Sequence, residues 1–165
     1  MSTRKSPENL AEALKLEPQQ MAALIALGHQ FYENGKYKTA KDIFQGIQVL
    51  DAKNPYAPAI LGSIAQREKK YANAISQYSL AIALHPKGIS LLVNRGECYL
   101  AEGKLAEAGA DFRDAIQLDP KQTDPAANRA RFLGALTLEG LELAEKKGIK
   151  AVMEAKRRID EQLAL

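Results

Sequence analysis

The chain has 165 residues, of which 46% are hydrophobic and 6% aromatic, and it contains no tryptophan. The formal net charge is +3 and both signs are spread along the chain, which argues against a protein that binds nucleic acid through a basic face. The single cysteine, Cys98, excludes an intramolecular disulfide and favours a reducing compartment. The longest apolar run, from Met21 to Leu27, is too short to cross a bilayer, and the opening residues lack the apolar core of a signal peptide. These features predict a soluble, cytoplasmic protein.

Residues 1–20 precede the regular part of the chain. We expect residues 1–5 to be disordered and a short helix to run from Pro7 to about Leu16, with Ser6 as its cap. Leu10 and Leu14 share one face of this helix, which is too short to be stable unless it packs on something. Two roles stay open: it covers the end of the helices that follow, or it joins two copies of the chain in a homodimer.

Residues 21–120 carry a pattern that repeats every 34 residues, in units of about 21–54, 55–88 and 89–122. A glycine on the first helix of each unit is expected to let the second helix approach closely, with a small alanine and an aromatic residue opposite it. The equivalent positions are Gly28, Gly62 and Gly96; Ala40, Ala74 and Ala108; and Phe44, Tyr78 and Phe112. This period and pattern are typical of the tetratricopeptide repeat.

Each unit is predicted to be a helical hairpin. The expected helices span 19–33 and 38–50, then 56–69 and 72–84, then 89–102 and 105–118. Asn34-Gly35 indicates a left-handed helix stop and Gly103 a turn, and Asn54-Pro55 is typical of a cap followed by the first helical position. The fold class is therefore all-α, a solenoid of three tetratricopeptide repeats with capping helices at both ends.

Residues 123–165 depart from the period and are expected to cap the array. Asp124-Pro125 opens a helix that Gly134 and Gly140 weaken. A final segment, 149–163, has apolar residues at helical spacing and basic residues on its other side. A basic amphipathic helix can be a membrane or calmodulin-type element, but acidic residues cancel much of this charge. A packed or partly mobile capping helix is the favoured interpretation, and whether the chain after Gly148 is ordered stays open.

The sequence predicts no enzyme, no cofactor and no metal site. The two histidines, His29 and His85, lie on different repeats without partners at metal-ligand spacing. The sequence has neither a glycine-rich phosphate loop nor a nucleophile elbow. Cys98 follows Gly96 by two residues, where a small buried side chain is expected, so core packing is favoured over a reactive thiol.

The candidate functional surface is a concave groove lined by the first helices, which suits an extended peptide. The residues that line it are expected at positions two, five, six, nine, twelve and thirteen of each unit, counted from Met21, Pro55 and Ile89. The predicted groove residues are Ala22, Ile25, His29, Tyr32, Tyr56, Ala59, Ile60, Ser63, Gln66, Arg67, Val93, Asn94, Glu97 and Leu100.

The sequence argues against one known use of such a groove. Tetratricopeptide co-chaperones that grip a chaperone's C-terminal carboxylate use lysine, asparagine and arginine at five of these positions. The five positions hold Ile25, His29, Ile60, Ser90 and Asn94 here. The carboxylate clamp is therefore absent.

Residues 21–118 resemble the class II type III secretion chaperones, which hold translocator subunits in the bacterial cytoplasm before export. The segments that carry the resemblance are FYENGKYKTAKDIFQGIQVLD, ILGSIAQREKKYANAISQYSLAIAL and RGECYLAEGKLAEAGADF. The resemblance implies a chaperone whose groove binds an extended segment of a translocator through small apolar anchors. The chain departs from the family in its short leader before the first repeat and in its longer, basic tail.

The predicted function is thus a non-enzymatic chaperone for secreted translocator proteins, acting through protein binding without nucleic acid or membrane insertion. The alternative is a generic tetratricopeptide scaffold or adaptor in another bacterial assembly. An accessory domain cut from a larger enzyme is a weaker third possibility.

Overall fold

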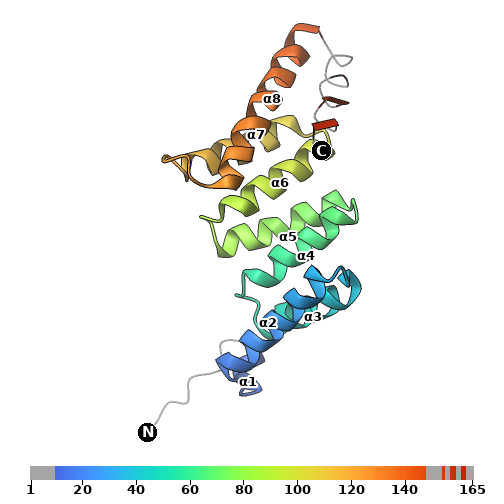
Figure 1. Cartoon of the computed structure of the whole chain (residues 1–165), viewed down its shortest axis with the longest axis vertical. Helices are drawn as coiled ribbons and strands as arrows, with labels where there is room; N and C mark the ends of the chain where they lie inside the picture. The colour runs from blue at the N-terminus through green and yellow to red at the C-terminus, as the bar shows by residue number, and fades with distance from the viewer. Residues whose placement is uncertain (1–9, 148–153, 155–156, 159–160, 163–165) are drawn as a thin grey trace.

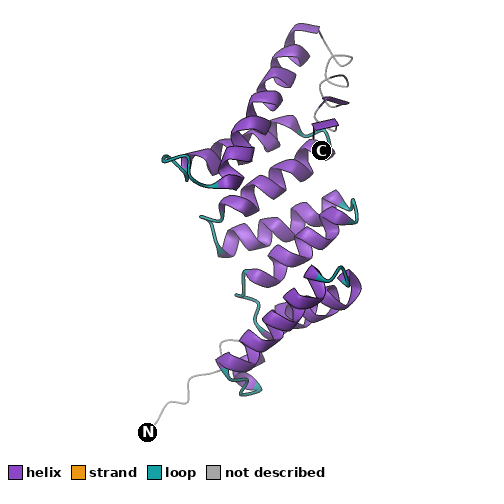
Figure 2. Ribbon diagram, in the orientation of Figure 1, coloured by secondary structure: helices purple, strands orange, loops and turns teal. Residues whose placement is uncertain are grey.

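The computed structural model describes residues 10–147, 154, 157–158 and 161–162, and within them the chain forms eight helices and no strand (Figures 1 and 2). Seven of the eight have at least 12 residues. The helices are α1 (Leu10–Ala13), α2 (Pro18–Glu33), α3 (Tyr37–Leu50), α4 (Tyr56–Arg67), α5 (Tyr71–Leu84), α6 (Ile89–Ala101), α7 (Leu105–Gln117) and α8 (Pro125–Lys147). The predicted all-α class is confirmed.

The helices pair into three hairpins, α2 with α3, α4 with α5 and α6 with α7, stacked along the long axis of the molecule (Figure 1). Each second helix also packs on the first helix of the next hairpin, and α8 continues this pattern by packing on α7 and α6. The predicted boundaries of the six hairpin helices agree with the observed ones to within two residues.

The two ends differ more from expectation. Only Leu10–Ala13 of the predicted N-terminal helix is described as helical, and its predicted start at Pro7 lies outside the described residues. Gly134 and Gly140 were expected to weaken the last helix, yet α8 runs without a break through both and reaches 23 residues. Most of the predicted segment 149–163 lies outside the described residues.

A glycine facing an aromatic ring sets the spacing within each hairpin. A Cβ atom at Gly28 would lie 2.8 Å from the Phe44 ring, which leaves no room for a side chain. The same distance separates Gly62 from Tyr78, and it is 2.6 Å for Gly96 and Phe112. The repeat therefore uses the missing side chain of the glycine to seat a large ring in the core.

Each of the three turns between paired helices contains one residue in the left-handed backbone conformation. Gly35 has the predicted left-handed conformation, with a φ of 71°, and Gly103, where the sequence predicted a turn, has a φ of 74°. At the equivalent position of the second hairpin stands Lys69, with a φ of 58°. The turn geometry is thus the same in all three hairpins, although only glycine adopts it without steric cost.

Polar side chains bond to the first turns of α4 and α8, although α4 begins at Tyr56 with Pro55 at its N-cap, one residue later than the sequence predicted. The side-chain oxygen of Asn54 accepts a hydrogen bond of 3.0 Å from the backbone N–H of Tyr56. Asp124 accepts two such bonds through Oδ1, from Ala126 at 2.8 Å and Ala127 at 3.0 Å. These bonds satisfy N–H groups that a helix start otherwise leaves unpaired.

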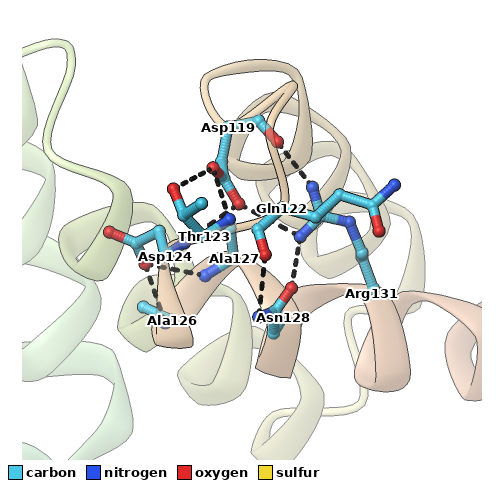
Figure 3. A network of polar contacts seen from close by, with 8 residues as sticks. All are labelled: Asp119, Gln122, Thr123, Asp124, Ala126, Ala127, Asn128 and Arg131. Carbon is cyan, nitrogen blue, oxygen red and sulfur yellow. Dashed lines mark hydrogen bonds and ion pairs between the residues drawn. The ribbon is translucent and has the colours of Figure 1, made fainter.

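The link between α7 and α8 is held by the buried side chain of Asp119 (Figure 3). Its carboxylate accepts hydrogen bonds from the backbone N–H groups of Thr123 and Asp124 and from Nη1 of Arg131. Arg131 Nη2 also donates to the backbone oxygen of Asp119, at 2.6 Å. Burial alone would raise the pKa of Asp119, but these donors together hold it below its ordinary value. The network fixes the start of α8 against the last hairpin.

An ion pair between the half-buried Arg95 and the buried Asp111 joins α6 and α7 within the last hairpin. Arg95 donates from Nε and Nη2 to the two carboxylate oxygens of Asp111, at 2.9 and 2.7 Å, and from Nη1 to Ser79 Oγ of α5 at 3.0 Å. The paired geometry satisfies both groups in a site where water is largely excluded.

Cys98 is fully buried beside Ala74 and Tyr78. Burial raises the pKa of its thiol to about 12. The location agrees with the prediction of a packing role for this residue.

Candidate functional site

The predicted groove residues lie on α2, α4 and α6, the first helices of the three hairpins. We call this surface, together with Arg129 of α8, the first-helix face. Hydrogen bonds between side chains cross it from each first helix to the next. We call this set of contacts the polar ladder.

The first part of the polar ladder joins α2 to α4. The hydroxyls of Tyr32 and Ser63 share a hydrogen bond of 2.6 Å, and Arg67 Nε donates to the Tyr32 oxygen at 3.0 Å. The Arg67 guanidinium also lies over the rings of Tyr32 and Tyr37, at 5.4 and 5.5 Å from their centroids. Such cation–π contacts add to the hydrogen bond and orient Arg67.

The second part joins α4, α6 and α8 through Glu97. Its carboxylate accepts a hydrogen bond of 3.1 Å from Gln66 Nε2 and lies 2.7 Å from Arg129 Nε. Gln66 is held in turn by the hydroxyl of Tyr78, which donates to its Oε1 at 2.8 Å. Arg129 Nη2 donates to Asn94 Oδ1 at 2.9 Å. Four successive first helices are therefore linked by side chains.

The pKa of Glu97 is raised above its ordinary value by the position of this residue in the polar ladder. Burial is the largest cause and raises its pKa, while Arg129 and Gln66 act in the opposite direction without fully compensating. The folded protein thus holds a proton on Glu97 more readily than the unfolded chain does.

The predicted groove residues differ in their accessibility. Tyr56 is 58% exposed, Ala22 is also exposed, and Ile25, Ala59 and Ile60 are half-buried. A pocket of about 320 Å³ opens beside two of them. It is lined by Pro55, Tyr56, Ala59, His85, Gly88, Ser90 and Leu91.

Two predicted groove residues belong to the core instead. Val93 is 0% exposed and Leu100 is 1% exposed, and both pack in a cluster with Ala130 and Leu133 of α8. The prediction that they line an open groove is wrong, because α8 covers the part of α6 that carries them. On the first-helix face, the accessible apolar residues named above therefore lie on α2 and α4.

Sequence reasoning missed Arg129, although it completes the polar ladder. The 34-residue period does not extend beyond Thr123, because the link between α7 and α8 is longer than the links that lead into α4 and α6. No pattern in the sequence pairs Arg129 with Glu97 and Asn94, so only the packing of α8 on α6 brings them together.

The described residues contain no group of three or more histidine, cysteine, aspartate or glutamate side chains arranged to hold a metal ion. His29 instead packs edge-on against the Phe44 ring, with centroids 5.8 Å apart. None of the described helices combines the length and apolar character that a bilayer crossing requires.

Comparisons with known proteins agree with this geometry. The sequence model of the tetratricopeptide repeat matches residues 61–123. The solved structure of the type III secretion translocator chaperone SycD from Yersinia enterocolitica superposes with a TM-score of 0.70 at 26% identity, covering 78% of this chain and 98% of SycD. PcrH from Pseudomonas aeruginosa, in complex with the chaperone-binding region of PopD, gives a TM-score of 0.71 at 27% identity, over 75% of this chain and 95% of PcrH.

Two curated relatives extend the comparison. The chaperone SicA from Salmonella typhimurium is 29% identical over 125 residues, which are 76% of this chain and 72% of SicA. RNA polymerase II-associated protein 3 from Rattus norvegicus is 28% identical over 163 residues, 97% of this chain. This chain spans 24% of the length of that larger protein.

The protein therefore has the all-helical tetratricopeptide-repeat fold. More narrowly, it is similar to the class II type III secretion translocator chaperones SicA, SycD and PcrH, and also to RNA polymerase II-associated protein 3. The resemblance inferred from the sequence is confirmed.

Proposed function

We propose that this protein is a non-enzymatic chaperone of the bacterial cytoplasm that binds an extended segment of a secreted translocator subunit along the first-helix face. Holding such a segment keeps apolar regions of the client from associating or entering a membrane before export. The complex of the similar protein PcrH with a region of PopD supports this class of client. A second solved complex, of SycD with a peptide of YopD, supports it further.

The observation that carries the proposal is the division of the first-helix face into two parts. On α2, Ala22 is exposed and Ile25 is half-buried, and on α4 the exposed Tyr56 and the half-buried Ala59 line a pocket. On α6 and α8 the face carries Asn94, Glu97 and Arg129 of the polar ladder, whose other members lie on α2 and α4. Apolar side chains of an extended segment can dock on the first part, because a few convergent pockets are what such ligands require.

Paired substitutions test this site. Replacing Ala22 and Tyr56 with glutamate puts two charges on the apolar part without disturbing the core, since both side chains are exposed. We expect at least a tenfold loss of affinity for the chaperone-binding region of PopD and for the corresponding segments of the source organism's own translocators, measured by fluorescence anisotropy. The control is Leu80→Glu, on the exposed surface of α5. Equal affinities in all three proteins would show that the client binds elsewhere.

A generic scaffold role is the second candidate. It is favoured by the likeness to RNA polymerase II-associated protein 3, which is not a secretion chaperone by name. The absence of the carboxylate clamp argues against a chaperone C-terminus as its partner. Stable recovery of the protein in a multiprotein complex, with no translocator bound, would favour the scaffold over the chaperone.

We also propose that the chain forms a homodimer through its N-terminal end. Leu10 of α1 and Leu14, which directly follows α1, are both exposed, and SycD has been solved as a dimer. Light scattering on the purified protein tests this proposal, and a monomer at micromolar concentration would contradict it.

A further inference from the structure

The first-helix face carries an arginine that has no carboxylate partner among the described residues. Arg67 is the last residue of α4, and its side chain is exposed. Every other described arginine lies 2.7 to 3.8 Å from a carboxylate oxygen, namely Arg95, Arg113, Arg129, Arg131, Arg157 and Arg158. Arg67 is thus the one arginine in the described part of the chain whose charge no ion pair balances.

The acidic residue that acts on Arg67 does so only weakly. Glu33 lies at the equivalent position of α2, one repeat period earlier, and is exposed. The pKa of Arg67 is raised chiefly by its hydrogen bond to Tyr32, and Glu33 is the smallest contributor. Glu33 therefore attracts Arg67 from beyond ion-pair distance and leaves it accessible to another anion.

Arg67 is held in place by two tyrosines instead of a carboxylate. Its Nε donates to the Tyr32 oxygen at 3.0 Å, and its guanidinium lies over the rings of Tyr32 and Tyr37. A guanidinium has five N–H donors in a planar fork, and this bond uses the one on Nε. The donors on Nη1 and Nη2 form no hydrogen bond with the described residues.

This arrangement suits a carboxylate. An arginine fork and a carboxylate can form two parallel hydrogen bonds that carry opposite charges, which is stronger and more directional than a contact between neutral groups. Because Tyr32 and Tyr37 already orient the guanidinium, less side-chain freedom is lost when the anion binds. In a polypeptide ligand, the groups with this chemistry are the side chains of aspartate and glutamate and the C-terminus.

The position of Arg67 relative to the apolar pocket sets a spacing. Tyr56, which lines the pocket, and Arg67 are eleven residues apart on α4, which is about three helical turns. They therefore lie on the same face of the helix, separated by about 16 Å along its axis. An extended chain advances about 3.3 Å per residue, so it needs about five residues to reach from one to the other.

We propose that Arg67 binds an aspartate or glutamate side chain of the client segment, about five or more positions away from the residue whose apolar side chain enters the pocket beside Tyr56 and Ala59. This inference rests on the proposed function and adds a charge requirement to it. It differs from the carboxylate clamp, because a single guanidinium contacts a side chain within the segment and the end of the client chain is not recognised.

A glutamate scan of a client segment tests the proposal. The probe is the chaperone-binding region of PopD, amidated at its C-terminus, in versions that carry a single glutamate or a single glutamine at successive positions. Fluorescence anisotropy gives the affinity of each version for the native protein and for Arg67→Gln. We expect one or two neighbouring positions at which the native protein binds the glutamate version at least fivefold more tightly than the glutamine version. Arg67→Gln should lose this preference.

Three further variants separate recognition of a carboxylate from a general effect of charge. Arg113→Gln removes the same charge from an exposed position on α7 and should keep the preference. Arg67→Lys retains the charge without the planar fork and should keep only part of it. Glu33→Gln removes a competing carboxylate and should increase it. Higher ionic strength should reduce the preference in the native protein.

The possible results distinguish this inference from the proposed function. If the PopD region binds but no position prefers glutamate, or if the preference persists in Arg67→Gln, the inference fails and the proposed function stands. A preference for an anion that appears only when the peptide has a free C-terminus would assign Arg67 to a chain end and also contradict the inference. If the native protein does not bind the PopD region at all, both fail.

Discussion

Single residues decide whether the repeat geometry is strained or relaxed. The turn between α4 and α5 places Lys69 at a φ of 58°, where its two counterparts are glycines. A side chain at this φ brings Cβ close to the following carbonyl oxygen. The second hairpin therefore carries a local cost that the first and third do not.

We expect Lys69→Gly to stabilise the protein. Removing the steric cost should outweigh the extra freedom of glycine in the unfolded chain and raise the free energy of unfolding by roughly 0.5–1 kcal/mol. Urea denaturation followed by circular dichroism measures the change. The reciprocal substitution Gly103→Lys should lower the free energy of unfolding, and a loss of stability in the first variant would contradict the interpretation.

Elements of the fold were predictable where sequence and packing repeat together. The boundaries of the six hairpin helices followed from glycine, alanine and aromatic positions, because each position has one packing partner in every unit. The course of α8 was harder to predict. Its propensity is weakened by Gly134 and Gly140, but packing on α7 outweighs that effect: the space beside Gly134 is filled by Phe112 and Ile116.

The close contact between α4 and α5 depends on the missing side chain of Gly62. A methyl group at Gly62 would meet the Tyr78 ring at 2.8 Å, so Gly62→Ala should separate α4 from α5 and cost about 1–3 kcal/mol of unfolding free energy. The control is Gly46→Ala, in the exposed part of α3, where nothing lies within 4 Å of the new Cβ. Thermal unfolding compares the two, and equal midpoints would show that the glycine spacing does not set the helix distance.

At the scale of the whole molecule, the candidate site was only partly predictable. Position counting named Tyr32, Ser63, Gln66 and Glu97, which the structure links across three helices. The position of a residue within its repeat does not show whether its side chain is accessible or covered by α8. Val93 and Leu100 were therefore assigned to the groove although they are buried.

The acidity of Glu97 makes stability depend on pH. Its pKa is raised above the ordinary value of 4.5 in the folded state, chiefly by burial. As pH rises from below 4.5 through that raised pKa, the folded protein gives up a proton that it holds more tightly than the unfolded chain does, so Glu97 lowers stability over this window.

We therefore expect Glu97→Gln to gain stability relative to the native protein as pH rises over this window. The difference in unfolding free energy should be smallest below pH 4.5 and largest near pH 7, because glutamine does not titrate. Denaturation curves at several pH values measure it. A difference that is constant with pH would show that burial does not govern this carboxylate.

The hydrogen bonds between Asp119 and Arg131 determine where further repeats can be inserted into the array. New repeats can be inserted at the turns that lead into α4 or α6, where the 34-residue phase is intact. An insertion between Asp119 and Arg131 would instead separate these two residues, and α8 would lose the hydrogen bonds that hold its start against the last hairpin. A longer array should therefore receive its additional repeats before α6, so that the last hairpin and α8 stay together with their contacts intact.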